Sequence, residues 1–109
     1  MPNNVKTQNG KFMFSERIKE LRIQNQLPQR QLAAALDIDT ATYCKIEKGE
    51  RRAKREQVEI IAQILNVDKK ELTTLWLADK VYEVVGDEIN AHDILNVVNE
   101  NIVRYGQKI

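Results

Sequence analysis

The chain has 109 residues, of which 42% are hydrophobic and 30% are charged, and its formal net charge at pH 7 is +1. These totals are ordinary for one small globular domain, and no apolar run approaches the roughly 18 to 20 residues that cross a bilayer. With one cysteine, Cys44, and one histidine, His92, the sequence excludes an intramolecular disulfide and favours neither a metal site nor a Ser-His-Asp triad, so we expect a cytoplasmic, non-enzymatic protein without cofactors.

The N-terminal part of the chain is expected to contain a tail and two short helices. Residues 1–12 are polar and show no periodicity, which is typical of a disordered tail. Apolar residues then recur at helical spacing, and Ser15 can cap the start of the first helix. Asn25 is expected to end that helix, because Asn tolerates the left-handed conformation common at helix ends. A second helix begins near Pro28, where a missing N–H costs little.

The middle of the chain predicts a third helix over 40–48. Asp39 is a suitable N-cap for this helix and Gly49 a suitable residue just past its end. Asp37 stands where the chain must reverse and is among the few residues that tolerate positive φ.

Three more helices are expected after it. They lie at about 55–65, from Asp68 to Gly86, and within 90–105. No segment alternates with a period of two, so the fold class is predicted to be all-α.

The connection between the second and third helices is only a few residues long. Such a short link makes two helices cross steeply, as in the helix-turn-helix unit. If Tyr43 and Ile46 turn into a core shared with Leu32 and Leu36, the opposite face of the third helix points outward. Its side chains are small or basic, which suits entry into the major groove of DNA. They belong to Thr40, Ala41, Cys44, Lys45 and Lys48.

A basic stretch follows, ERRAKR at residues 50–55, and it can supply contacts to DNA phosphates or be a merely solvated surface. The charge along the chain agrees with a DNA-facing first part. Residues 1–67 carry twelve Lys and Arg against eight Asp and Glu, whereas residues 68–109 carry five against eight. An asymmetry of this size also arises by chance, so by itself it is not evidence for DNA binding and only agrees with the helix-turn-helix pattern.

The pattern QxxLAxxLxIxxxxxxxIExG is present with matching spacing and residue type at many positions. It is formed by Gln29, Leu32, Ala33, Leu36, Ile38, Ile46, Glu47 and Gly49. With this pattern, residues 14–75 resemble the five-helix domain of Cro/C1-type (XRE-family) regulators of bacteria and phages. The resemblance implies a lambda-repressor-like DNA-binding domain with a C-terminal helical extension, and double-stranded DNA as the partner.

The resemblance also implies roles for individual residues. Thr40, Ala41, Thr42 and Lys45 match positions that approach base edges, and Gln29 matches one that approaches the DNA backbone and an adjacent base. Cys44 lies beside the base-reading residues and is placed with them, as a small group tolerated at DNA in preference to a redox switch. For the DNA backbone we expect Gln29, Arg30, Lys48, Arg51, Arg52, Lys54 and Arg55.

The pair matching Arg22 and Glu47 forms a salt bridge in that family and orients the reading helix.

The chain departs from the family at Pro28, which lacks the usual side-chain cap, and at Asp37, where glycine is common. Asp39 and Glu50 place carboxylates near the expected path of the phosphates, and each is expected to lower affinity somewhat.

Residues 76–109 carry apolar residues on more than one helical stripe, more than a small hairpin can bury on one side. Such a surface usually has a partner. A homodimer is the economical interpretation, because a two-fold protein places two reading helices about 34 Å apart on a palindromic operator. The expected interface residues are Trp76, Val81, Val85, Leu95, Val98 and Ile102. For Trp76, a place in the core is the alternative to a dimer anchor.

Two alternatives remain for this segment. The last helix can fold back over the first five. The C-terminal helices can instead bind a different protein, which would make the chain an antitoxin or another protein-interaction module. The predicted domains are the tail at 1–12, the DNA-binding domain at 13–75 and the C-terminal helices at 76–109.

Overall fold

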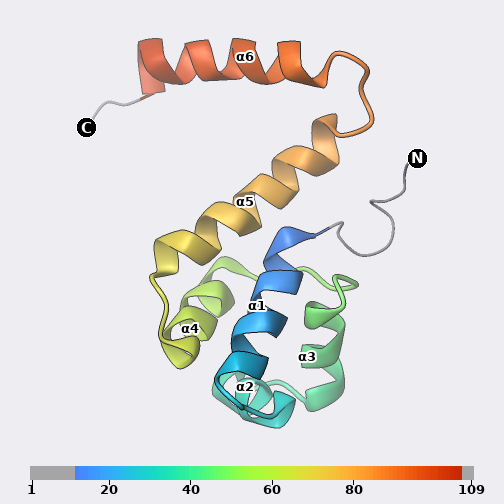
Figure 1. Cartoon of the computed structure of the whole chain (residues 1–109), viewed down its shortest axis with the longest axis vertical. Coiled ribbons are helices and arrows are strands. Elements are labelled where there is room, and N and C mark those ends of the chain that lie inside the picture. The colour runs from blue at the N-terminus through green and yellow to red at the C-terminus, as the bar shows by residue number, and fades with distance from the viewer. Residues whose placement is uncertain (1–11, 107–109) are drawn as a thin grey trace. The chain divides into compact units, whose positions relative to one another are not determined.

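The computed structural model describes residues 12–106 and shows only helices and their connections there (Figure 1). The all-α class is therefore confirmed over this range. The predicted tail lies outside the described residues apart from Phe12. The helical elements in chain order are α1 (Met13–Gln24), α2 (Gln29–Leu36), α3 (Thr40–Glu47), α4 (Arg55–Leu65), α5 (Lys69–Val85), α6 (Ala91–Asn101) and the π-helical turn η2 (Ile102–Gly106).

The chain divides into two compact units, and the division falls inside α5, between Asp79 and Lys80. The predicted boundary after residue 75 lies one turn earlier in the same helix. None of the helices in the described range is long and apolar enough to cross a membrane.

The first unit encloses one hydrophobic core. α2 packs on α3 and α4, and α1 packs on the same two helices (Figure 1). Burying each Leu or Ile side chain contributes about 1.5–3 kcal/mol, so this core supplies most of the driving force for folding. The most deeply buried side chains are those of Ile18, Leu32, Tyr43, Ile46, Val58, Ile61, Leu65 and Leu72.

Two turns around α3 have the backbone that the sequence predicts. Asp37 ends α2 with φ +60°, and Gly49 follows α3 with φ +78°. At Gly49 an added Cβ would lie 2.8 Å from Cδ2 of Phe12, so both the conformation and the lack of space require glycine. Asn25 ends α1 as its C-cap, as the sequence predicts, but it does not adopt the left-handed conformation: its φ is −90°, and the left-handed residue is Gln26, at φ +56°. The Asn25 side chain instead donates to the Leu21 carbonyl (2.8 Å), so the turn is completed one residue later.

The start of α1 also differs from the sequence prediction. The helix begins at Met13, and Ser15 lies inside it as a buried residue, not as the N-cap. The carboxylate of Asp79, far along the chain in α5, accepts hydrogen bonds from the backbone N–H groups of Met13 (2.9 Å) and Phe14 (3.0 Å). This side chain is only 4% exposed. It satisfies two of the N–H groups that a helix start leaves unpaired and lies at the positive end of the helix dipole.

The second unit contains the end of α5, then α6 and η2. α5 ends at Val85, directly before Gly86, as the sequence predicts. The expected sixth helix is present, but its last turn widens into the π-helical η2. Neither α6 nor η2 has a buried residue.

Candidate nucleic-acid interface

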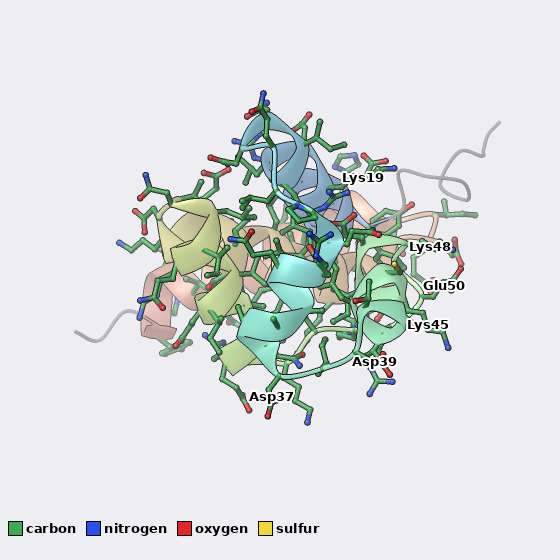
Figure 2. All side chains as sticks on the ribbon, turned by 90° about the horizontal axis from the view of Figure 1, so that it is seen from below. Lys19, Asp37, Asp39, Lys45, Lys48 and Glu50 are labelled. Atoms are coloured by element: carbon green, nitrogen blue, oxygen red, sulfur yellow. The ribbon has the colours of Figure 1, made fainter. Side chains whose placement is uncertain are left out.

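The outward face of α3 is set by the residues that α3 turns inward. Tyr43, Ile46 and Glu47 are buried, and their helical spacing directs the intervening residues away from the core. Lys45 is exposed, and Figure 2 shows it together with Lys48 on the outer side of the unit at α3. Of the other predicted base-reading residues, Thr40 and Ala41 are exposed, and Thr42 and Cys44 are half-buried.

Asp39 caps α3, as the sequence predicts. Its carboxylate accepts a hydrogen bond from the Thr42 backbone N–H at 2.7 Å. Hydrogen bonds from Thr42 lower the pKa of Asp39, and the nearby charges of Lys45 and Arg51 lower it further. Asp39 is therefore ionised at neutral pH, and its charge stabilises the positive end of the α3 dipole. The carboxylate that is unfavourable near phosphates thus holds the first turn of the reading helix.

A buried carboxylate joins α3 to the first two helices. Glu47 is 6% exposed. Its Oε2 accepts from Arg22 Nε (2.6 Å) and from the Tyr43 hydroxyl (2.7 Å), and its Oε1 accepts from Arg22 Nη2 (3.2 Å) and Gln29 Nε2 (3.1 Å). Arg22 Nη1 also donates to the carbonyl of Leu27, at 2.8 Å. The pair that the resemblance implies is therefore the centre of a network that reaches α1, the start of α2 and α3.

The protonation states in this network favour the observed hydrogen bonds. The hydrogen bond to Glu47 raises the pKa of Arg22, which therefore keeps its charge. Burial raises the pKa of Tyr43 far above its usual range, and the hydrogen bond to Glu47 adds to this effect. Tyr43 is therefore protonated at neutral pH and can donate to Glu47.

Gln29 and Cys44, both predicted to face DNA, contact each other. While Nε2 of Gln29 donates to Glu47, its Oε1 accepts from the Cys44 thiol at 3.0 Å. Sequence reasoning missed this contact. The spacing of fifteen residues across a turn carries no signal for it, because the contact depends on how steeply α2 and α3 cross.

Most of the predicted backbone-contacting residues are exposed. Two of them stack on aromatic rings: the Arg52 guanidinium lies 6.0 Å from the ring centre of Phe12, and that of Arg55 lies 5.4 Å from the ring centre of Trp76. Glu50 lies beside Lys45 and Lys48 and reduces the positive charge there (Figure 2). The exposed basic residues of this set are Arg30, Lys48, Arg51, Arg52, Lys54 and Arg55, whereas Gln29 is half-buried.

The predicted dimer residues fall into two groups. Trp76 is part of the core of the first unit, where its indole N–H donates to the Ala53 carbonyl (2.8 Å), and only 7% of the residue is exposed. Val85 is equally buried, so both residues have little surface to offer a partner. Val81, Leu95, Val98 and Ile102 are exposed, at 39% to 50%.

Two short helices joined by a tight turn, with a small, basic outward face on the second, define a helix-turn-helix unit. A model of the helix-turn-helix family matches residues 18–72, about half of the chain. The chain belongs to this family, and the match agrees with the resemblance to the DNA-binding domain of Cro/C1-type (XRE-family) proteins.

The chain is similar to the cryptic phage CTXphi transcriptional repressor RstR of Vibrio cholerae, with 36% identity over 62 residues. That match covers 57% of this chain and 56% of the repressor, so the chain spans about half the length of the curated relative that it matches. No solved structure matches the chain.

Proposed function

We propose that this chain is a sequence-specific transcription regulator that acts in the cytoplasm as a homodimer on a palindromic operator. The observation that carries the proposal is the small, basic outward face of α3, which the buried Glu47 network holds in place. In this proposal the DNA-binding domain spans residues 13–75, and α3 enters the major groove. Similarity to a phage transcriptional repressor supports a role at a promoter.

The base-reading role rests most on Lys45, because its exposed ammonium group can donate to O6 and N7 of guanine. Thr40 and Ala41 are exposed at the start of the same helix and can offer methyl groups to thymine. The exposed basic residues around α3 would then bind phosphates and fix the position of the protein on the duplex without reading sequence.

Replacing Lys45 by Ala is expected to reduce discrimination at one base pair by about 1–3 kcal/mol. Arg51→Ala is expected to weaken binding to all sequences alike and to lower the slope of log K against log salt by about one, since one phosphate contact is lost. Lys69→Ala is the matched control. Lys69 is exposed and is the first residue of α5, and the start of α5 lies away from α3 in Figure 1.

The measurement is fluorescence anisotropy with duplexes that tile the DNA upstream of the protein's own gene, at two salt concentrations, against a scrambled duplex. The protein should bind one of the tiled duplexes tightly, and added salt should weaken this binding far less than it weakens binding to the scrambled duplex. Equal, salt-sensitive binding to every tile would leave only the general attraction to phosphate and contradict sequence-specific recognition. If both variants bind like the wild type, the DNA face is not at α3.

The homodimer is proposed to form through the second unit. α6 has eleven residues and none is buried, although Leu95, Val98 and the following Ile102 lie along one stripe. A helix this short is only marginally stable alone in water, so its apolar stripe is expected to pack on a partner. A second copy of the chain also provides the second reading helix that a palindrome requires.

Val98→Asp is expected to convert the dimer to a monomer, because it places a charge on the apolar stripe. Asn96→Asp is the matched control, since 100° per residue puts position 96 on the opposite face of α6. Light scattering coupled to size-exclusion chromatography measures the molar mass of the wild type and of each variant. A monomeric wild type would contradict the homodimer and favour the alternative, an antitoxin-like module whose C-terminal helices bind another protein. Co-expression with the product of a neighbouring gene would test that alternative.

A further inference from the structure

The carboxamide of Gln29 is held at both ends. Its nitrogen donates to Glu47 at 3.1 Å, and its oxygen accepts from the Cys44 thiol at 3.0 Å. The two bonds are not interchangeable, because a carboxylate can only accept and the amide oxygen requires a donor. The rotation of the amide group, which is free in an exposed glutamine, is therefore restricted in this side chain.

One N–H group of the same carboxamide remains available. A glutamine amide has two N–H groups. One is used by Glu47, and the second donates to no residue between Phe12 and Gly106. Gln29 is the first residue of α2 and is half-buried, so the residue keeps some exposed surface. Pro28, the N-cap, provides no side-chain hydrogen bond to this end of the helix.

We infer that Cys44 is a positioning residue: its thiol holds the Gln29 amide so that the second N–H donates to a DNA phosphate. The inference rests on the proposed function and refines the place of Cys44 in it. With only the bond to Glu47, the amide could swing about that single contact, and the direction of the second N–H would be undefined. The Cys44 bond supplies the second fixed point, and Cys44 thereby acts on DNA through Gln29 instead of reading a base.

The side chain of Cys44 suits this role because it is short and half-buried. From α3 its Sγ lies 3.0 Å from Oε1 of Gln29. A serine can make the same type of bond with its hydroxyl, whereas an alanine cannot. This difference separates the loss of the hydrogen bond from the loss of a small side chain.

The test measures operator binding of four variants: Cys44→Ala, Cys44→Ser, Gln29→Ala and the double variant Cys44→Ala/Gln29→Ala. Cys44→Ala is expected to weaken binding roughly three- to tenfold, the scale of one neutral hydrogen bond. The salt slope should not change, since no charge is removed. Cys44→Ser should restore binding to within about twofold. The double variant should bind no more weakly than Gln29→Ala, because Cys44 has no effect once the amide is gone.

Two outcomes of the binding series would overturn the inference. Additive losses in the double variant would mean that Cys44 contacts DNA directly. A Cys44→Ser protein as weak as Cys44→Ala would mean that the size of the side chain matters, not its donor. Thermal melting of each variant shows that it is folded at the assay temperature.

A measurement without DNA separates failure of the inference from failure of the proposed function. In free protein labelled with nitrogen-15, the side-chain amide resonances of Gln29 should shift in Cys44→Ala and return toward the wild-type position in Cys44→Ser. Unchanged resonances in Cys44→Ala would show that Cys44 does not hold the amide, whatever the DNA result. Shifted resonances in a protein that binds no DNA specifically would refute the proposed function, and the positioning role would fall with it.

Discussion

Replacing Arg22 by Met is expected to lower the free energy of unfolding by about 3 kcal/mol, at the lower end of the range for breaking a buried ion pair. The cost arises because the carboxyl group of Glu47, which is 6% exposed, loses its cationic partner and two hydrogen bonds. Met retains the apolar part of the arginine side chain, so packing changes little. For a domain of this size, such a loss lowers the melting temperature by more than about 10 °C, which calorimetry resolves easily.

Arg17→Met is the matched control for Arg22→Met. Arg17 lies on the same helix and forms ion pairs with Glu20 and Glu71, both at 2.8 Å. These three side chains are between 34% and 58% exposed, so water screens the interactions and the melting temperature should change little. Equal losses in the two variants would contradict the view that burial of Glu47 makes the Arg22 pair important.

Replacing Asp79 by Asn is expected to lower the free energy of unfolding by about 1–3 kcal/mol. The carboxylate accepts from two backbone N–H groups at the start of α1, whereas an amide would direct its own N–H₂ group toward one of them. The substitution also removes a negative charge from the positive end of the helix. Urea denaturation followed by circular dichroism measures the change.

Ser15→Ala distinguishes the two explanations for the start of α1. Ser15 is the third residue of the helix as the structure has it, so its loss should leave stability nearly unchanged. If Ser15→Ala lowered the free energy of unfolding as much as Asp79→Asn does, α1 would be capped by Ser15 and not by Asp79 of α5. Hydrogen exchange at the amide of Phe14, which bonds to Asp79 at 3.0 Å, gives a second readout because it should become faster only in Asp79→Asn.

Much of this protein could be predicted from local patterns. The start of α4 and the end of α5 follow from apolar spacing and from residues such as Gly86, and the turns at Asp37 and Gly49 follow from the few residue types that accept positive φ. The outward face of α3 also follows, because burying Tyr43 and Ile46 leaves only one direction for Lys45. These features depend on residues within one or two helical turns of each other.

Other features required the packed structure. Asp79 caps a helix that begins 66 residues earlier, and the thiol of Cys44 is turned toward Gln29. Trp76 lies in the core, which decides between the two roles left open for it. Periodicity identifies the apolar face of a helix, but it does not say which other segment that face will meet. A hydrogen bond needs two groups within about 3 Å, and for groups far apart in sequence that proximity is created only when the helices pack.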